Sequence, residues 1–297
     1  MKKFVNLVDI GFVGYGNANH AYGGYLLAYS MNNVCGQEWF NSFQDIILDF
    51  IGKRYLPIYR MADGEFDFLF GPVFNYRKKH FLKDLAVYIK KWIRFYSLGF
   101  ETSWGENYSL TQILQLRKKL ISDLQQISTQ GYLALYFNKN GHFELNTLNK
   151  TLEKRFQAIN CPLTQNNYVP FHFVCNLLMQ RRYLEFFSNK NILLVSGFTS
   201  EDREKIKRNL SVLTPKNLEF INTSKTHSML DSIELEKLHV KPDIAFVAAG
   251  VGSANIISQL SRLNCPCIDI GGLMKSFISP SFTYHGNVFG FPGTIKL

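Results

Sequence analysis

Residues 243–270 read DIAFVAAGVGSANIISQLSRLNCPCIDI, and this stretch decides the fold. It contains an apolar run, a loop of small residues, a segment with apolar residues at helical spacing, and a second apolar run. We expect strands at 243–247 and 266–270, with a helix at 253–263 between them. Because both runs are apolar throughout, the strands are expected to be parallel and covered on both faces.

The same alternation predicts further elements upstream. They are strands at 55–59, 132–137, 191–195 and 218–221, and helices near 43–51, at 110–127, 200–210 and 226–238. Gly52 supplies a stop for the first helix, and Ser109 with Gln112 has the spacing of a capping box at the start of the helix at 110–127. The sequence therefore predicts the α/β class, with a Rossmann-like parallel sheet and helices on both of its faces.

Ligands of such sheets bind beyond the carboxyl ends of the strands. Gly250 and Gly252 would let the backbone approach a ligand there, and Ser253 would begin a helix whose N–H groups suit a phosphate or a sugar hydroxyl. A tight turn that needs small residues explains the same glycines, and the pattern does not separate the two interpretations. Asp269 ends the last strand, where it would hold a sugar or ribose hydroxyl or cap a local turn.

The stretch RMADGE at 60–65 follows the strand at 55–59. Asp63 and Glu65 flank Gly64, and Arg60 precedes Asp63 by three residues. Carboxylate oxygens are ligands for hard divalent cations, and an arginine binds phosphate oxygens, so the arrangement suits a metal-bound diphosphate. Asp-Gly is also a common turn pair, and the spacing alone favours an open turn over a metal site.

Composition limits the partners that we expect. The chain has 297 residues, of which 46% are hydrophobic, and a formal net charge of +10. These values indicate a packed protein that attracts anionic partners, and we expect no nucleic acid among them because no recognised binding motif is present. A basic, aromatic-rich segment at 77–96 would contact an anionic membrane surface or a lipid-linked acceptor, or it would be an ordinary amphipathic helix.

Cysteine usage and hydropathy point to the compartment. The five cysteines do not form the pattern of a secreted disulfide framework, and Cys265 and Cys267 are expected to be buried on a strand rather than to bind zinc. Asn6 and Asp9 interrupt the apolar amino-terminal stretch, which argues against a secretory signal. No window approaches the roughly 18 apolar residues of a membrane span. We therefore predict a cytoplasmic protein. Peripheral binding at the inner face of the membrane is an alternative that the sequence does not exclude.

A second motif leads to a different function. Residues 5–16 read VNLVDIGFVGYG, which is similar to the first motif of S-adenosylmethionine-dependent methyltransferases. The residues that follow, 17–22, are a poor opening for the helix that such a site needs. A methyltransferase that uses the loop from Asp9 to Gly16 therefore stays an alternative.

The motif at 60–65, together with the end of the chain, resembles the GT-D type bacterial glycosyltransferases. That family has an R-x-G-D-G-E motif, and near its end a strand, an A-G loop, a helix and a strand that ends in I-D-I-G. In this chain the strand and the A-G loop are at 246–250, the helix begins at 253, and the strand that ends in I-D-I-G is at 267–271. The resemblance covers about 40–277, so we expect an extension of unclear role at 1–36 and a GT-D-like glycosyltransferase domain at 37–297. Ala62 replaces a glycine of the family motif, and Gly272 stands where the family often has histidine.

The resemblance implies transfer of a sugar from a nucleoside-diphosphate sugar, by analogy a UDP-sugar. The acceptor would be a glycan or a lipid-linked molecule of bacterial surface polysaccharide or glycoprotein synthesis. Asp63 and Glu65 would hold Mn²⁺ or Mg²⁺, and the catalytic base would be Glu65, Asp67 or Asp269. The substrate would be bound by Arg60, Gly64, Gly250, Gly252, Ser253 and Gly271. A non-catalytic protein that binds or assembles glycans, and another enzyme that handles nucleotides or sugar phosphates, remain alternatives.

Overall fold

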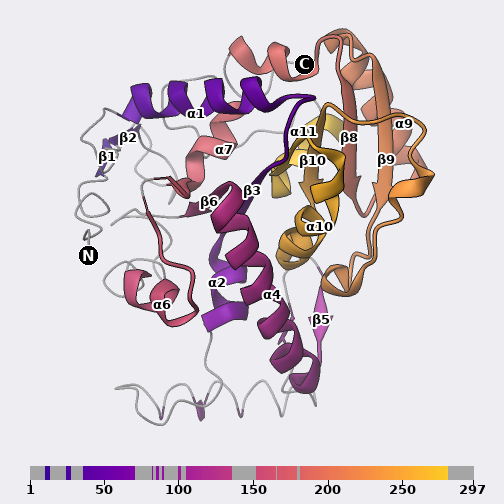
Figure 1. The fold of residues 1–297 in the computed structure, drawn as a ribbon. Helices are drawn as coiled ribbons and strands as arrows, with labels where there is room; N and C mark the ends of the chain where they lie inside the picture. The colour runs from indigo at the N-terminus through magenta and orange to yellow at the C-terminus, as the bar shows by residue number, and fades with distance from the viewer. Residues whose placement is uncertain are drawn as a thin grey trace.

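The structure is a computed structural model, and its elements are shown in Figure 1. It describes residues 11–13, 25–27, 36–70, 82, 85–86, 89, 100–101, 105–135, 152–164, 166–178 and 181–279. In this part of the chain, seven strands form one sheet, and two short antiparallel pairs lie outside it. No helix of the described residues has the length and apolar character that crossing a membrane requires.

The strands of the sheet are β3 (Leu56–Met61), β6 (Tyr132–Leu135), β7 (Tyr168–Pro170), β8 (Asn191–Ser196), β9 (Asn217–Asn222), β10 (Ile244–Ala248) and β11 (Pro266–Asp269). The short pairs are β1 (Gly11–Val13) with β2 (Tyr25–Leu27), and β4 (Phe100–Glu101) with β5 (Asn107–Tyr108). The helices are α1 (Gly36–Phe50), α2 (Asp63–Phe70), α4 (Leu110–Gln130), α6 (Leu152–Ala158), α7 (Phe171–Leu177), α8 (Leu184–Phe187), α9 (Ser200–Leu210), α10 (Ser253–Gln259) and α11 (Met274–Ile278).

The sheet has the order β7-β6-β3-β11-β10-β8-β9, and each of its neighbouring pairs is parallel. All seven strands therefore end at the same edge. The predicted α/β class, with a parallel sheet, is confirmed. The order changes direction between β3 and β11: the chain runs outward from β3 to β6 and β7, and it returns to β11 from the other half of the sheet.

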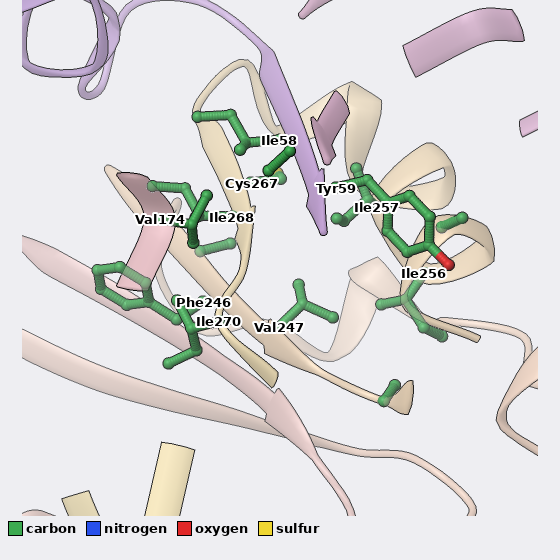
Figure 2. Packing of buried hydrophobic residues seen from close by; sticks show 14 of the residues in the cluster. Ile58, Tyr59, Val174, Phe246, Val247, Ile256, Ile257, Cys267, Ile268 and Ile270 are labelled. Atoms are coloured by element: carbon green, nitrogen blue, oxygen red, sulfur yellow. The ribbon is translucent and has the colours of Figure 1, made fainter. Parts of the chain in front are cut away.

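Helices cover both faces of the sheet. Helices α4 and α10 pack against each other and against β3 on one face, and α7 packs against β3 and β6 on the other. Figure 2 shows the two layers of buried side chains: Tyr59 lies with Ile256 and Ile257 of α10, whereas Val174 of α7 lies on the side of Ile268. The register that pairs Ile58 with Ile268 places Tyr59 and Asp269 on the α10 face of the sheet.

Most predicted elements are present with small changes at their ends. Helix α9 has the predicted bounds, and α4 begins at the predicted residue after the capping box of Ser109 and Gln112. The helix predicted at 253–263 is α10 followed by a short 3₁₀ helix at Leu260–Leu263. Gly52 follows α1 with a φ of 68°, which is the conformation expected of a glycine that ends a helix. Cys265 and Cys267 are buried as predicted, but only Cys267 lies in a strand, β11, which Cys265 precedes.

The helix predicted at 226–238 is wrong. The structure has two short 3₁₀ helices there, at Ser228–Leu230 and Leu235–Lys237. Side chains of α10 take the backbone groups that a helix would use: the N–H of Ile233, which a helix would pair with the Met229 carbonyl, donates to Gln259 Oε1 at 2.8 Å. The side-chain amide of Asn255 donates to the carbonyls of Met229 and Asp231. Apolar spacing predicted the helix, but long-range side-chain hydrogen bonds replace the helical ones.

Three predictions fall wholly or largely outside the described residues. The basic segment at 77–96 is described only at Leu82, Leu85, Ala86 and Ile89, and the loop from Asp9 to Gly16 only at Gly11–Val13. The boundary at residue 36 also stays a prediction, because the preceding residues are described only in β1 and β2.

A buried hydroxyl in the core leads to a stability prediction. Tyr59 has no exposed surface, and its hydroxyl has no hydrogen-bond partner in the described structure. A buried polar group without a partner costs about 1–3 kcal/mol, so Tyr59→Phe is expected to stabilise the protein by part of that amount. Tyr108→Phe is the matched control and should destabilise it, because the Tyr108 hydroxyl accepts the Met229 N–H at 3.1 Å. Urea unfolding of both variants measures the difference. A loss of stability in Tyr59→Phe would contradict the prediction.

Candidate functional site

The candidate site lies at the carboxyl ends of β3 and β11, where the strand order changes direction. From β3 the chain enters α2 and continues to α4 on one face of the sheet. From β11 it enters α11, which packs against α9. Because the two connections diverge, the strand ends between them are the position at which open α/β sheets bind ligands. Asp269 ends β11, and the segments that follow the two strands contain Asp63, Gly64, Glu65 and Gly271.

Glu65 is held at the first turn of α2 and faces inward. Its Oε2 accepts the N–H of Ala62 at 2.9 Å, which is the reciprocal half of a capping box. The residue is 6% exposed, so the open turn considered from the sequence is replaced by a buried helix start. Burial, and then the nearby charge of Asp269, raise the pKa of Glu65 to about 7.

Asp269 is the last residue of β11 and is 3% exposed. Its Oδ1 accepts the hydroxyl of Ser253 at 3.2 Å and the N–H of Gly271 at 3.1 Å. Burial raises the pKa of Asp269 to about 6, although the charge of Arg60 and these hydrogen bonds oppose the rise. Ser253 is therefore placed at the site, where it orients the carboxylate of Asp269.

Arg60 supplies positive charge beside both carboxyls. Its guanidinium carbon lies 4.7 Å from the centre of the Phe171 ring, and Nη1 lies 3.6 Å from Cys175 Sγ, so α7 fixes the side chain. The other end of the guanidinium lies against Gly271, whose φ is 46°: a Cβ there would overlap Nη2 and would lie 2.9 Å from Cζ. The charge of Arg60 lowers the pKa of Glu65 and of Asp269, against the stronger effect of burial.

These three groups have the charge balance of a cation site. When both carboxyls are ionised, one guanidinium leaves a negative charge in a buried place, and burial, which is the largest cause of each raised pKa, disfavours that charge. A proton or a metal ion would neutralise this negative charge, and carboxylate oxygens suit Mg²⁺ or Mn²⁺. Within the described residues no group of three His, Cys, Asp or Glu side chains could hold a metal. Asp63 begins α2 beside Glu65, and Asp67 follows in the same helix; their side chains lie outside the described part.

Three N–H groups of the turn at 249–253 already donate to acceptors of the protein. Val251 N–H donates to Glu106 Oε2 at 3.3 Å, Ala249 N–H donates to Ser253 Oγ at 3.0 Å, and Gly252 N–H donates to the Ala249 carbonyl. A Cβ at Gly252 would overlap Ser228 Oγ, so close packing against Ser228 accounts for this glycine. Gly250 has a φ of 55°, which accounts for the other.

Glu106 is the functional candidate that the sequence interpretation missed. It is 1% exposed, and it lies beside the turn at 249–253 although it is more than 140 residues away in sequence. No motif surrounds it, and its neighbours Gly105 and Asn107 are typical of a surface loop. Only the long-range fold reveals that its carboxylate is buried.

Comparisons with known proteins give one weak likeness. No protein-family model matches the chain, and no curated protein matches it. A solved structure of the highly conserved domain of unknown function 1792, described as having a distinct glycosyltransferase fold, is similar in part. The similarity covers 80% of this chain and 83% of that one, with a TM-score of 0.42 and 14% sequence identity. At this level the likeness does not identify the activity or the site residues of this chain.

Proposed function

We propose that this protein is a metal-dependent glycosyltransferase that moves a sugar from a nucleoside-diphosphate sugar, such as a UDP-sugar, to a glycan or lipid-linked acceptor. The proposal rests on one observation. Two buried carboxyls with raised pKa values, Glu65 and Asp269, lie beside Arg60 where the strand order changes direction. Glu65 and Arg60 belong to the motif at 60–65, and Asp269 belongs to the second stretch on which the resemblance to GT-D type enzymes rests.

Each residue has a role that its environment supports. Glu65 and Asp269, with Asp63 at the start of α2, are the carboxylates that would hold Mn²⁺ or Mg²⁺. A bound divalent cation would supply Lewis acidity to the diphosphate leaving group. Arg60 adds positive charge at the edge where the diphosphate would lie. At neutral pH a carboxyl with a pKa of about 6 is mostly ionised and one with a pKa of about 7 is half ionised, and either is more basic than an ordinary carboxylate toward the proton of an acceptor hydroxyl.

The proposed reaction breaks one bond and forms another. The bond between the anomeric carbon and the diphosphate oxygen breaks, and its electron pair leaves with the nucleoside diphosphate. The acceptor oxygen bonds to the anomeric carbon, and its proton passes to the carboxylate of Asp269 or Glu65. Burial around the carboxylates favours transfer to the acceptor over hydrolysis, because it limits the access of water.

Thermal unfolding with metal and nucleotide sugars tests the proposal. We expect Mn²⁺ with a UDP-sugar to raise the melting temperature by a few degrees at saturating ligand, because a ligand that binds only the folded state stabilises it. The increase should be larger at pH 8 than at pH 5.5, because protons compete for carboxyls with pKa values of about 6 to 7. Glu65→Gln should remove it.

The matched control is Glu204→Gln, which removes one negative charge from an exposed position of α9 and should keep the full response. Chromatography of reaction mixtures then shows which nucleotide sugar is consumed. A panel of nucleotide sugars that gives neither a metal-dependent shift nor turnover would overturn the proposal. A shift with S-adenosylmethionine instead would favour the methyltransferase alternative.

A further inference from the structure

The carboxylate of Glu106 joins parts of the chain that are far apart in sequence. Oε1 accepts the hydroxyl of Ser228 in a very short contact and that of Tyr108 at 3.4 Å, and Oε2 accepts the N–H of Val251 at 3.3 Å. Burial raises the pKa of Glu106, and these three hydrogen bonds oppose the rise. The carboxylate therefore binds the segment at 105–108 to two loops at the carboxyl edge of the sheet.

The donors around Glu106 require a carboxylate rather than an amide. The Tyr108 hydroxyl accepts the Met229 N–H and donates its own hydrogen to Oε1, while Val251 N–H approaches Oε2, so both oxygens must accept. Glutamine has one acceptor oxygen, and its NH₂ group can only donate. An amide at this position would place donor against donor at either Tyr108 or Val251, and one buried donor would lose its partner.

The turn that Glu106 holds leads directly to Asp269. Val251 precedes Ser253 by two residues, and Ser253 Oγ accepts the Ala249 N–H while it donates to Asp269 Oδ1. The turn is also closed from outside, because Ser228 Oγ contacts the Ala249 carbonyl at 2.6 Å. A displacement of Val251 would therefore move the hydroxyl that orients Asp269.

We propose that Glu106 is a positioning residue: its carboxylate fixes the turn at 249–253, and through Ser253 it sets the orientation of Asp269. The part of this inference that concerns turnover rests on the proposed function. The coupling between Glu106 and Ser253 does not, because it is a property of the folded chain. A purely structural tether would stabilise the protein without making the effect of Ser253 depend on Glu106.

A double-mutant cycle with Glu106→Gln and Ser253→Ala tests the coupling in two ways. For kcat/KM with a UDP-sugar, we expect each single variant to lose about tenfold to a hundredfold, mainly in kcat, and the double variant to lose no more than the worse single one. For unfolding in urea, the midpoint of the double variant should match that of the less stable single variant. Glu106→Asp, which keeps two acceptor oxygens, should recover part of both losses.

Glu219→Gln is the matched control, because Glu219 lies on the edge strand β9 and contacts His239 instead of the turn. Combined with Ser253→Ala, it should give additive changes. Additive changes for Glu106→Gln as well, in both turnover and urea midpoint, would overturn the inference. If the wild type turns over no UDP-sugar, the proposed function fails, and the urea cycle alone decides whether Glu106 and Ser253 are coupled.

Discussion

Gly271→Ala is expected to reduce turnover by at least ~100-fold and to lower stability by about 2–4 kcal/mol, whereas Gly272→Ala should change neither. Gly271 has a φ of 46°, which an alanine adopts only at a cost of about 1–2 kcal/mol. Its new Cβ would also overlap Arg60 Nη2 and lie 2.9 Å from Cζ. The guanidinium would have to leave its position between Phe171 and the backbone of Gly271.

A displacement of Arg60 would also change the pKa values of Glu65 and Asp269. Its charge lowers the pKa of Glu65 and of Asp269, so its departure would raise both and would leave two buried carboxylates with less compensation at neutral pH. In the variant, the pH at which turnover reaches half of its maximum should therefore move upward. This shift separates the loss of Arg60 from general unfolding, which would reduce turnover equally at every pH.

The neighbouring glycine makes a close control. Gly272 is exposed, and a Cβ there would meet nothing within 4 Å. Turnover and thermal unfolding of the two variants, measured between pH 5 and 9, provide the comparison. Equal behaviour of Gly271→Ala and Gly272→Ala would show that the contact between Arg60 and Gly271 has no importance for the site.

The sheet was predictable because its strands are short apolar runs at regular intervals. The run at Ile244–Ala248 is buried on both faces, and such strands need no alternation of polar residues. The prediction of a helix at 226–238 failed because the apolar residues of this segment have helical spacing, whereas the side-chain amides of Asn255 and Gln259 bond to its backbone groups. Both of these residues lie in α10, so no local pattern contains the information.

Part of the site was predictable because some of its residues lie in local sequence patterns. The motif at 60–65 and the Asp269 stretch are local signals, and parallel strands bring their ends together at one edge. Nothing local indicates that Gly271 contacts Arg60, that Gly252 contacts Ser228, or that Glu106 accepts the N–H of Val251. These contacts join residues that are 24 to more than 200 positions apart, and only the fold fixes them.

Glu65→Gln is expected to inactivate the protein and to stabilise it at high pH. In the folded state the pKa of Glu65 is about 7, against an ordinary value of 4.5, so the folded protein binds this proton more tightly than the unfolded chain does. Stability therefore falls as pH rises from about 4.5 to 7, and it stays low above that range. The cost of ionising Glu65 is on the order of 3 kcal/mol at pH 8, and glutamine removes it.

The glutamine keeps the local structure, because its side-chain oxygen can still accept the N–H of Ala62. Unfolding in urea with EDTA present, at pH 4.5 and at pH 8, measures the effect. We expect equal stability of variant and wild type at pH 4.5 and a more stable variant at pH 8, with turnover reduced by at least ~100-fold because a metal ligand is lost.

Glu204→Gln, at an exposed position, should show no gain at pH 8. Parallel pH profiles for Glu65→Gln and the wild type would mean that Glu65 is not held in a site that disfavours its charge. The reason to expect a metal there would then be lost.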